Sequence, residues 1–332
     1  MDLNVKRNEY VFRLPLLHYL VRDPRDFPLI QMWGNVVLTT IPSALLVYLD
    51  PVFGPLYWLG NLILWQERWV LGQHFTAHRQ VLRWRILDHI FLTLVSPFFG
   101  IPYWQYYLHH VIMHHRGNNR HRSDLSSTEP YQRDNLLHFL HYWLRFLFCI
   151  WVELPLYAWR KRRYDQMIYA LLGSFGYFLL LAYLDCQPTF WVFWLPLLSS
   201  SLTLMFGNWS QHIFIDPTRT KSAFGNSYSC INTPSNQRSF NDGYHTEHHL
   251  KPDRHWSELP SSFARKIQLY QNEDAIVFQG IDFFSVGFLV FQNNWENLLD
   301  HMVTTRPRTR EEKKRRLIEL LRPITGDSGR AA

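Results

Sequence analysis

Three long stretches of this chain contain no charged residue, and they restrict the possible fold more than any other feature. They cover residues 29–49, 167–184 and 189–207. A helix rises about 1.5 Å per residue, so each stretch can cross a hydrocarbon core of about 30 Å. A fourth stretch, residues 52–72, is apolar as far as Trp65 and then reaches Glu67. We therefore predict an all-α integral membrane protein with four transmembrane helices, rather than four buried helices of a large soluble protein.

The four predicted helices pair as two hairpins. The first pair is separated by Asp50-Pro51 and the second by Asp185-Cys186-Gln187-Pro188, and neither turn contains Lys or Arg. By the positive-inside rule, both hairpins should insert from the cytoplasm and both termini should stay there. We expect no signal peptide, because the N-terminal apolar segment is short and interrupted. The basic residues gather on the other side of the spans: Lys6, Arg7, Arg13, Arg22, Arg25, Arg79, Arg83, Arg85, Arg160, Lys161, Arg162 and Arg163.

Two further apolar stretches fit the membrane less well. Residues 90–104 are too short to span comfortably, and residues 139–159 carry His141, Arg145 and Glu153. If either stretch crossed the bilayer alone, the histidine clusters described below would lie on opposite faces. We therefore interpret both as interfacial, amphipathic segments.

The net charge of +7 could suggest nucleic-acid binding, but the chain contains no recognised nucleic-acid motif. A membrane lipid surface or an acidic redox partner explains the charge better. The basic C-terminal tail, residues 303–332, has leucines and an isoleucine between its charges from residue 306 to 322. It is interpreted as an amphipathic helix on the membrane surface, with docking of an acidic electron carrier as the alternative.

Histidine clusters carry the chemical signal. Residues four apart on a helix share a face, so such a pair can point at one metal ion or at two neighbouring ions. The helical spacing favours His110 over the adjacent His109, whereas His115 can reach a second ion if the helix ends there. The four clusters are His74-Phe-Thr-Ala-His78, His110-Val-Ile-Met-His114-His115, Asn208-Trp-Ser-Gln-His212 and His245-Thr-Glu-His248-His249.

The number of these histidines indicates two metal ions. A single zinc or iron takes three or four protein ligands, so nine histidines are too many for one ion. Neutral imidazole favours Zn, Cu, Fe or Ni over Mg or Ca. No cysteine lies beside the clusters, because the three cysteines are Cys149, Cys186 and Cys230 and are interpreted as reduced, buried thiols. Two redox-active irons are therefore expected.

The order HxxxH, HxxxHH, NxxxH and HxxHH around two hairpins resembles the membrane fatty acid desaturase family, from about Leu29 to Pro252. The resemblance implies a four-helix transmembrane stem under a cytosolic cap, with the acyl chain in a tunnel below the irons. It also implies that Asn208 contributes through a water. The iron ligands that it implies are His74, His78, His110, His114, His115, His212, His245, His248 and His249.

Two segments depart from the family pattern. The last box is followed by Leu250-Lys251-Pro252-Asp253-Arg254-His255-Trp256 in place of a leucine-phenylalanine-proline run. Residues 124–133 are more similar to alkane-hydroxylase-like relatives. These departures affect the expected reaction outcome and not the metal site.

Residues outside the boxes receive structural interpretations. Metal-bound imidazoles usually donate their other N–H to a carboxylate or carbonyl. Nearby acids are therefore candidates for that role, namely Asp88, Asp124, Asp216, Asp242 and Glu247. The isolated histidines are interpreted as ordinary surface or core residues, namely His18, His89, His121, His138, His141, His255 and His301.

The sequence thus predicts one membrane domain over residues 1–332 that oxidises an unactivated C–H bond of a long-chain fatty acyl substrate with O₂. Desaturation to an alkene is the favoured outcome. A hydroxylase, an alkane monooxygenase, an alkene-forming decarboxylase and a non-catalytic membrane metal-binding protein are the alternatives. No Rossmann fingerprint is present, so electrons should come from a cytochrome b5 or ferredoxin type donor with its reductase. The membrane would be endoplasmic reticulum or a bacterial inner membrane.

Overall fold

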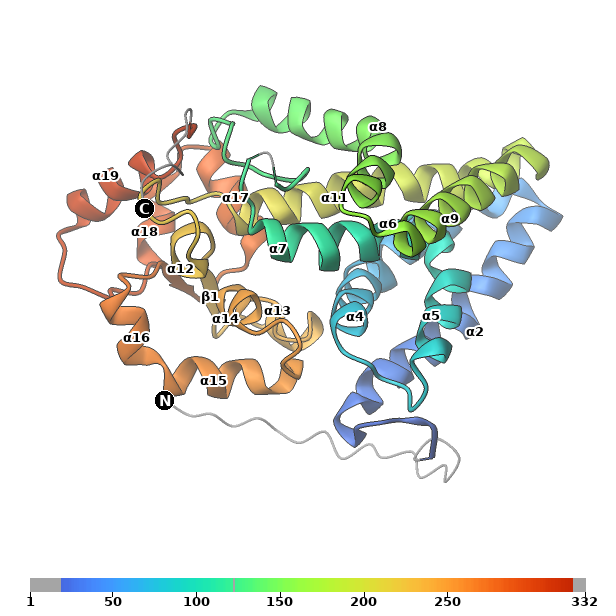
Figure 1. The fold of residues 1–332 in the computed structure, drawn as a ribbon, viewed down its shortest axis with the longest axis horizontal. Helices are drawn as coiled ribbons and strands as arrows, with labels where there is room; N and C mark the ends of the chain where they lie inside the picture. Colours follow the sequence, from blue (N-terminus) through green and yellow to red (C-terminus); the bar gives the residue numbers. More distant parts are fainter. Residues whose placement is uncertain (1–18, 122, 325–332) are drawn as a thin grey trace.

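The computed structural model describes residues 19–121 and 123–324 and is predominantly helical. Its described part contains one small sheet, in which β1 (Ser229–Ile231) pairs in parallel with β2 (Val277–Gln279). Figure 1 shows the long apolar helices α2 and α9 on one side of the molecule and helices α16, α18 and α19 on the other, with α11 reaching between them. This division separates an apolar part from a C-terminal region, residues 212–324.

The first two predicted spans form consecutive helical segments joined by a tight turn. The turn is stabilised by the Asp50 carboxylate, which accepts the Val52 N–H. Across the two segments, the Thr40 hydroxyl donates to the Asn61 side chain at 2.6 Å. The segments are η1 (Pro24–Asp26), α2 (Phe27–Leu49), η2 (Pro51–Phe53), α3 (Gly54–Asn61), the π-helix η3 (Leu62–Gln66) and α4 (Glu67–His78).

The other two predicted spans also follow one another through a short turn. There the Asp185 carboxylate accepts the Gln187 N–H. The Tyr48 hydroxyl lies 2.8 Å from the Thr189 hydroxyl and so joins this turn to α2. The segments are α9 (Tyr164–Tyr183), α10 (Cys186–Thr189), the π-helix η6 (Phe190–Trp194) and α11 (Leu195–Gln211), and α8 (Leu136–Arg160) precedes them.

Among the residues that the structure describes, four helical segments are long and apolar enough to cross a membrane, or five if the bent pair 85–99 and 103–117 is one span. The four are residues 24–49, 136–160, 164–183 and 186–211. The predicted number is therefore confirmed, and three of the four segments coincide with predicted spans. The predicted spans and the candidate segments differ in one segment. Residues 52–72 lie in a helical run that includes polar side chains such as Asn61 and Gln66, and this run is not among the candidates.

Helix α8, which we predicted to be interfacial, is instead long and apolar enough to cross a membrane. Its contacts nevertheless tie both of its ends to the segments that carry the histidines. The Tyr142 hydroxyl donates to the Ser126 carbonyl, and the Tyr157 hydroxyl lies 3.5 Å from the Ile112 carbonyl. The interfacial placement of α8 stays our prediction.

A sharp bend follows the second predicted span. Two helical segments, residues 85–99 and 103–117, meet at 103°. Gly100 makes the bend possible, since its φ is +67° and an added Cβ would lie 2.3 Å from the Leu197 Cα. The elements are α5 (Arg85–Val95), η4 (Ser96–Phe99), α6 (Tyr103–Tyr107), the π-helix η5 (Leu108–His114) and α7 (His115–Gly117).

The C-terminal region packs around a core that includes Trp209, Tyr228 and Phe278. Leu317, Leu320 and Leu321 belong to this core and are buried. The interpretation of the tail as a membrane-surface helix was therefore wrong, because the protein itself covers the leucines of the helix. The helices are α12 (Ala223–Asn226), α13 (Ser235–Arg238), α14 (His245–Leu250), η7 (Trp256–Glu258), α15 (Leu259–Arg265), α16 (Ile267–Asn272), α17 (Phe283–Phe291), α18 (Trp295–Asp300) and α19 (Arg310–Glu319).

Candidate metal centre

Five of the nine box histidines form one compact group, the first group. One ring nitrogen from each of the five lies within 4.8 Å of the others. The His248 Nε2 atom lies 2.7 Å from that of His74 and 3.0 Å from that of His115. The His115 Nε2 atom is 3.1 Å from the His110 Nε2 atom. The members are His74, His78, His110, His115 and His248.

The other four histidines form the second group. Ring nitrogens of His114, His212 and His249 lie within 4.8 Å of one another. His245 completes the group, since its Nε2 atom is 3.0 Å from that of His249 and 3.4 Å from that of His212. The two groups touch, because the ring centroids of His115 and His249 are 4.8 Å apart. All nine predicted ligands are thus brought to one place, divided five and four.

The π-helix η5 changes which histidines face the same way. Spacing on an α-helix pairs His110 with His114. In the structure His110 lies with His115 in the first group, whereas His114 lies in the second. A π-helix bonds residue i to residue i+5, so residues five apart replace residues four apart as neighbours along its surface. His110 and His114 thus point at two neighbouring positions, one of the two arrangements that their spacing allows.

The structure also separates His109 from His110 and places Asn208. The His109 Nε2 atom lies 3.0 Å from the Ser126 hydroxyl, outside both groups. The Asn208 amide donates to the Ser126 carbonyl and to the Tyr142 hydroxyl, at 3.0 and 2.7 Å. Asn208 therefore supports a loop that contacts the histidines, and a role through water stays a prediction.

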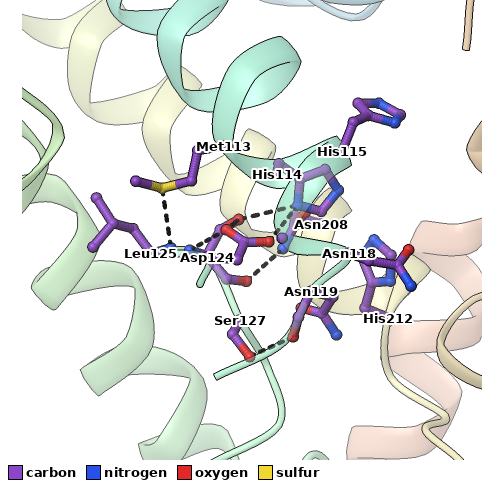
Figure 2. Close-up of polar contacts among 12 residues, drawn as sticks. Met113, His114, His115, Asn118, Asn119, Asp124, Leu125, Ser127, Asn208 and His212 are labelled. Atoms are coloured by element: carbon purple, nitrogen blue, oxygen red, sulfur yellow. Dashed lines mark hydrogen bonds and ion pairs between the residues drawn. The ribbon is translucent and has the colours of Figure 1, made fainter. Parts of the chain in front are cut away.

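Polar partners hold the outward-facing nitrogens of several histidines. The His114 Nδ1 atom lies 2.7 Å from the Asp124 carboxylate (Figure 2). The His212 Nδ1 atom lies 2.7 Å from the Asn226 carbonyl oxygen, a partner that side-chain patterns could not reveal. The His74 Nδ1 atom is 3.7 Å from Asp242. Such contacts orient imidazole rings so that Nε2 faces a metal ion.

Only two of the five candidate acids contact box histidines in the described structure. These are Asp124 and Asp242. Asp88 accepts backbone N–H groups of Val81 and Leu82, and Asp216 pairs with Arg219. Glu247 instead forms an ion pair with Lys266, at the start of α16.

Electrostatics favour neutral imidazoles and an ionised Asp124. Burial, with help from neighbouring histidines, lowers the pKa of His245, His248 and His249 well below its ordinary value. Burial alone would raise the pKa of Asp124, but His114 and His109 together hold it well below its usual range. The histidines can therefore act as metal ligands without first losing a proton.

Unsatisfied ring nitrogens supply a test of whether metal ions fit here. The His78 Nε2 atom is buried and has no hydrogen-bond partner among the described residues. Other pairs of Nε2 atoms in the two groups lie only 2.7–3.4 Å apart, and the neutral rings have too few N–H groups to donate to all of them. Buried polar atoms without partners are costly, and two cations would satisfy them. The donor set, all imidazole, fits a late first-row transition metal.

A third cluster of possible ligands is explained without a metal. Asp23, Asp26 and His255 lie close enough to hold an ion. However, Arg79 makes ion pairs with both carboxylates, and the His255 Nε2 atom lies 2.9 Å from Asp26. This cluster links the start of α2, the end of α4 and the segment after α14. His255 is thus a core residue, one of the two roles expected for it, and its sequence neighbours gave no sign of this link.

A cavity of about 500 Å³ adjoins the first group of histidines. Its wall includes His74 and His110, and its surface is mostly apolar. Leu147, Ile150 and Trp151 are part of the wall. The Trp151 ring packs on Phe178, which in turn contacts Trp194, so this side of the cavity, the apolar end, borders the apolar part of the molecule.

The Asp124→Asn substitution is expected to weaken metal binding by about 10- to 100-fold, because it removes the charge that orients His114. Titration of the metal-free protein with Fe²⁺ would measure the change. Asp134→Asn is a matched control, since Asp134 lies outside both groups and bonds to Gln132. Equal iron affinity for both variants would contradict the orienting role of Asp124.

Comparison with known proteins gives one family. The family model described as "Fatty acid desaturase" matches residues 51–279, which include all nine histidines. No curated protein and no solved structure matches.

Proposed function

This chain belongs to the fatty acid desaturase family, and on that premise we propose that it oxidises an unactivated C–H bond of a long-chain fatty acyl substrate. Desaturation to an alkene is the favoured outcome. The chain is an integral membrane protein of the oxidoreductase type, and O₂ is the proposed co-substrate. The observation that carries the proposal is the set of nine histidines, which surround two adjacent positions beside an apolar cavity.

The two groups of histidines would each hold one iron. When bound, the irons would supply O₂ activation and the oxidising power for the C–H bond. The residues of the chain have other tasks. The ring nitrogens that face one another would bind the metal, and Asp124 and the Asn226 carbonyl hold the rings of His114 and His212 in position. The apolar cavity wall excludes water and keeps the substrate in one orientation.

The acyl chain would lie in the cavity with one pair of carbons beside His74 and His110. The depth of the apolar end then determines which carbons reach the irons. Gln105, whose amide donates to the Ser174 hydroxyl at 2.6 Å, and Gly100 are also part of the cavity wall.

Trp151→Ala is expected to shift the preferred substrate by about two or more carbons toward longer chains, because it removes a large side chain at the apolar end. Gas chromatography of products from a mixture of chain lengths would measure the shift. Trp159→Ala is the control, since Trp159 is exposed and does not line the cavity. An unchanged chain-length profile in the Trp151 variant would contradict this placement of the chain end.

Electrons would come from a separate carrier of the cytochrome b5 or ferredoxin type. Two basic side chains, Arg116 and Lys251, are exposed beside His115 and His249. An acidic carrier would be attracted to this surface, which lies close to both groups. We propose that this face and both termini are cytoplasmic, in endoplasmic reticulum or a bacterial inner membrane, as the distribution of Lys and Arg suggests.

Product analysis is the experiment that tests the function. The protein would be expressed in membranes with a reductase and either electron carrier, and the lipids compared by mass spectrometry with those from membranes lacking it. New double bonds in the acyl chains would support desaturation. Hydroxylated or shortened products would keep the proposed site and change the reaction to hydroxylation or decarboxylation. Unchanged lipids, with no iron in the purified protein, would contradict the proposal.

A further inference from the structure

The cavity beside the first group of histidines reaches the outside of the protein at two residues. Of the residues that line it, only Glu67 and Phe284 are exposed. Asp282, which also lines the cavity and precedes Phe284 by two residues, lies near enough to Glu67 for the two carboxylates to interact electrostatically. Glu67 and Phe284 therefore border one opening, the mouth of the cavity.

One side of the mouth is polar, and its charges are held by the protein. Glu67 in α4 forms an ion pair with Arg238 in α13 at 3.4 Å, and both side chains are exposed. The Asp282 side chain accepts the Ser285 N–H and so caps α17. Exposed charged side chains are costly in hydrocarbon. This side of the mouth therefore belongs in water or among lipid head groups.

The other side of the mouth is apolar and continues a membrane span. Helix α17 contains no charged residue. Its Phe284 and Phe288 are 40% and 54% exposed, and they share a face because they are four residues apart. Both rings contact Phe206 in α11, at centroid distances of 5.4 and 4.8 Å, and α11 is part of the candidate span 186–211. Exposed aromatic rings beside a membrane span are typical of the membrane interface, so bilayer lipid is expected to cover this face of α17.

The Phe284 ring lies between that face and the cavity. The ring packs over Gly207, where an added Cβ would lie 3.8 Å from it, and both residues line the cavity. Because Gly207 has no side chain, the Phe284 ring covers this part of the wall by itself. The next residue inward, Phe283, is buried and its ring packs on that of His245 at 5.7 Å. A path past Phe284 thus leads from the lipid to the histidines, and a change of rotamer, which is fast for an exposed side chain, would open it.

We propose that the acyl substrate enters the cavity sideways from the bilayer, between α11 and α17, and that Phe284 is the gate. The ion pair of Glu67 and Arg238 would lie at the level of the head groups while the acyl chain passes the Phe284 ring. The inference rests on the proposed function for the acyl nature of the substrate, but it concerns only the route of entry.

Uptake kinetics would test the gate. The iron-loaded protein, without a reductant, would be placed in nanodiscs of neutral lipid that contain a spin-labelled lipid as quencher. A fluorescent fatty acyl probe dissolved in the same bilayer becomes bright when it leaves the quencher and enters the protein. Phe284→Trp should slow this uptake at least about fivefold and Phe284→Ala should speed it up, because the size of the side chain sets the width of the path. Phe288→Ala is the matched control, since Phe288 lies on the same face and does not line the cavity.

Photo-crosslinking would test whether lipid covers α17. Benzoylphenylalanine in place of Phe288 should form adducts with nanodisc lipid on irradiation, detected by mass spectrometry. The same group in place of Leu269 should form none, because Leu269 is exposed on α16, on the side of the molecule away from α2 and α9 (Figure 1).

Three results would overturn the inference. They are equal uptake rates in the wild type and both Phe284 variants, a change in Phe288→Ala as large as that in Phe284→Ala, and lipid adducts that are no more frequent at position 288 than at position 269. Uptake that depends on Phe284, without any oxidation under O₂ and a reductant, would contradict the proposed function alone. Oxidation of the acyl chain with uptake that ignores Phe284 would contradict the gate alone.

Discussion

Replacing His248 by alanine is expected to lower oxidation of the acyl substrate by at least about a thousandfold, because a metal ion supplies several kcal/mol to such a reaction. The His248 Nε2 atom lies within 3.0 Å of ring nitrogens from two other boxes. Its loss removes the member of the first group that α14 contributes. Product formation and the iron content of the purified protein are the measurements.

The second group allows the same prediction to be checked independently. His212→Ala should also abolish activity, and each variant should retain about one of two irons if each group holds its own ion. His301→Ala is the control, because the His301 ring contacts the Gln279 carbonyl and lies outside both groups. Full activity in either ligand variant, or unchanged iron content in both, would contradict two separate sites.

Lys266→Met is expected to lower the free energy of unfolding by about 3 kcal/mol, since it leaves a buried carboxylate without its cation. The Glu247 side chain has no exposed surface, and its Oε2 atom accepts from the Lys266 ammonium at 2.9 Å. The Ser262 hydroxyl donates to the same oxygen, and the Tyr270 hydroxyl lies 3.3 Å from Oε1. This network holds α14, and with it three ligands, against α15 and α16. Urea unfolding in detergent would measure the loss.

The comparison with Glu247→Gln makes this prediction specific. The amide keeps most of the shape and removes the charge. The Glu247→Gln variant should therefore lose less unfolding free energy than Lys266→Met, about 1–2 kcal/mol. The double variant Glu247→Gln, Lys266→Met should lose less unfolding free energy than the sum of the two single losses, as expected for groups in direct contact. Lys221→Met, at an exposed lysine, should change stability by less than about 0.5 kcal/mol. Additive losses would show that the ion pair does not act as one unit.

The membrane segments were predictable where hydropathy is unambiguous. Stretches without charge gave three of the four candidate spans. Residues 52–72 and helix α8 were harder, because their amphipathic composition is compatible with either lipid or protein surroundings.

The cluster of histidines was predictable in its members and less so in its grouping. Box spacing identified all nine histidines that the structure gathers. The π-helix η5 reassigned His114 and His115, since one additional residue per turn is not visible in the spacing of two histidines. Asp124 was one of five equal candidates, and the choice depends on a loop that folds back beside His114. The Asn226 carbonyl belongs to the backbone and leaves no side-chain pattern at all.

The first group joins residues that are distant along the chain, since His74 and His248 are 174 positions apart. An ion bound there would close a loop of that length and remove much of the conformational entropy of the unfolded chain. During biosynthesis, the early helices would be inserted long before the last box is translated. The metal would therefore bind late, as the last step in the folding of an otherwise assembled chain. The supply of iron in the cell should then determine how much of this protein accumulates, as well as how active it is.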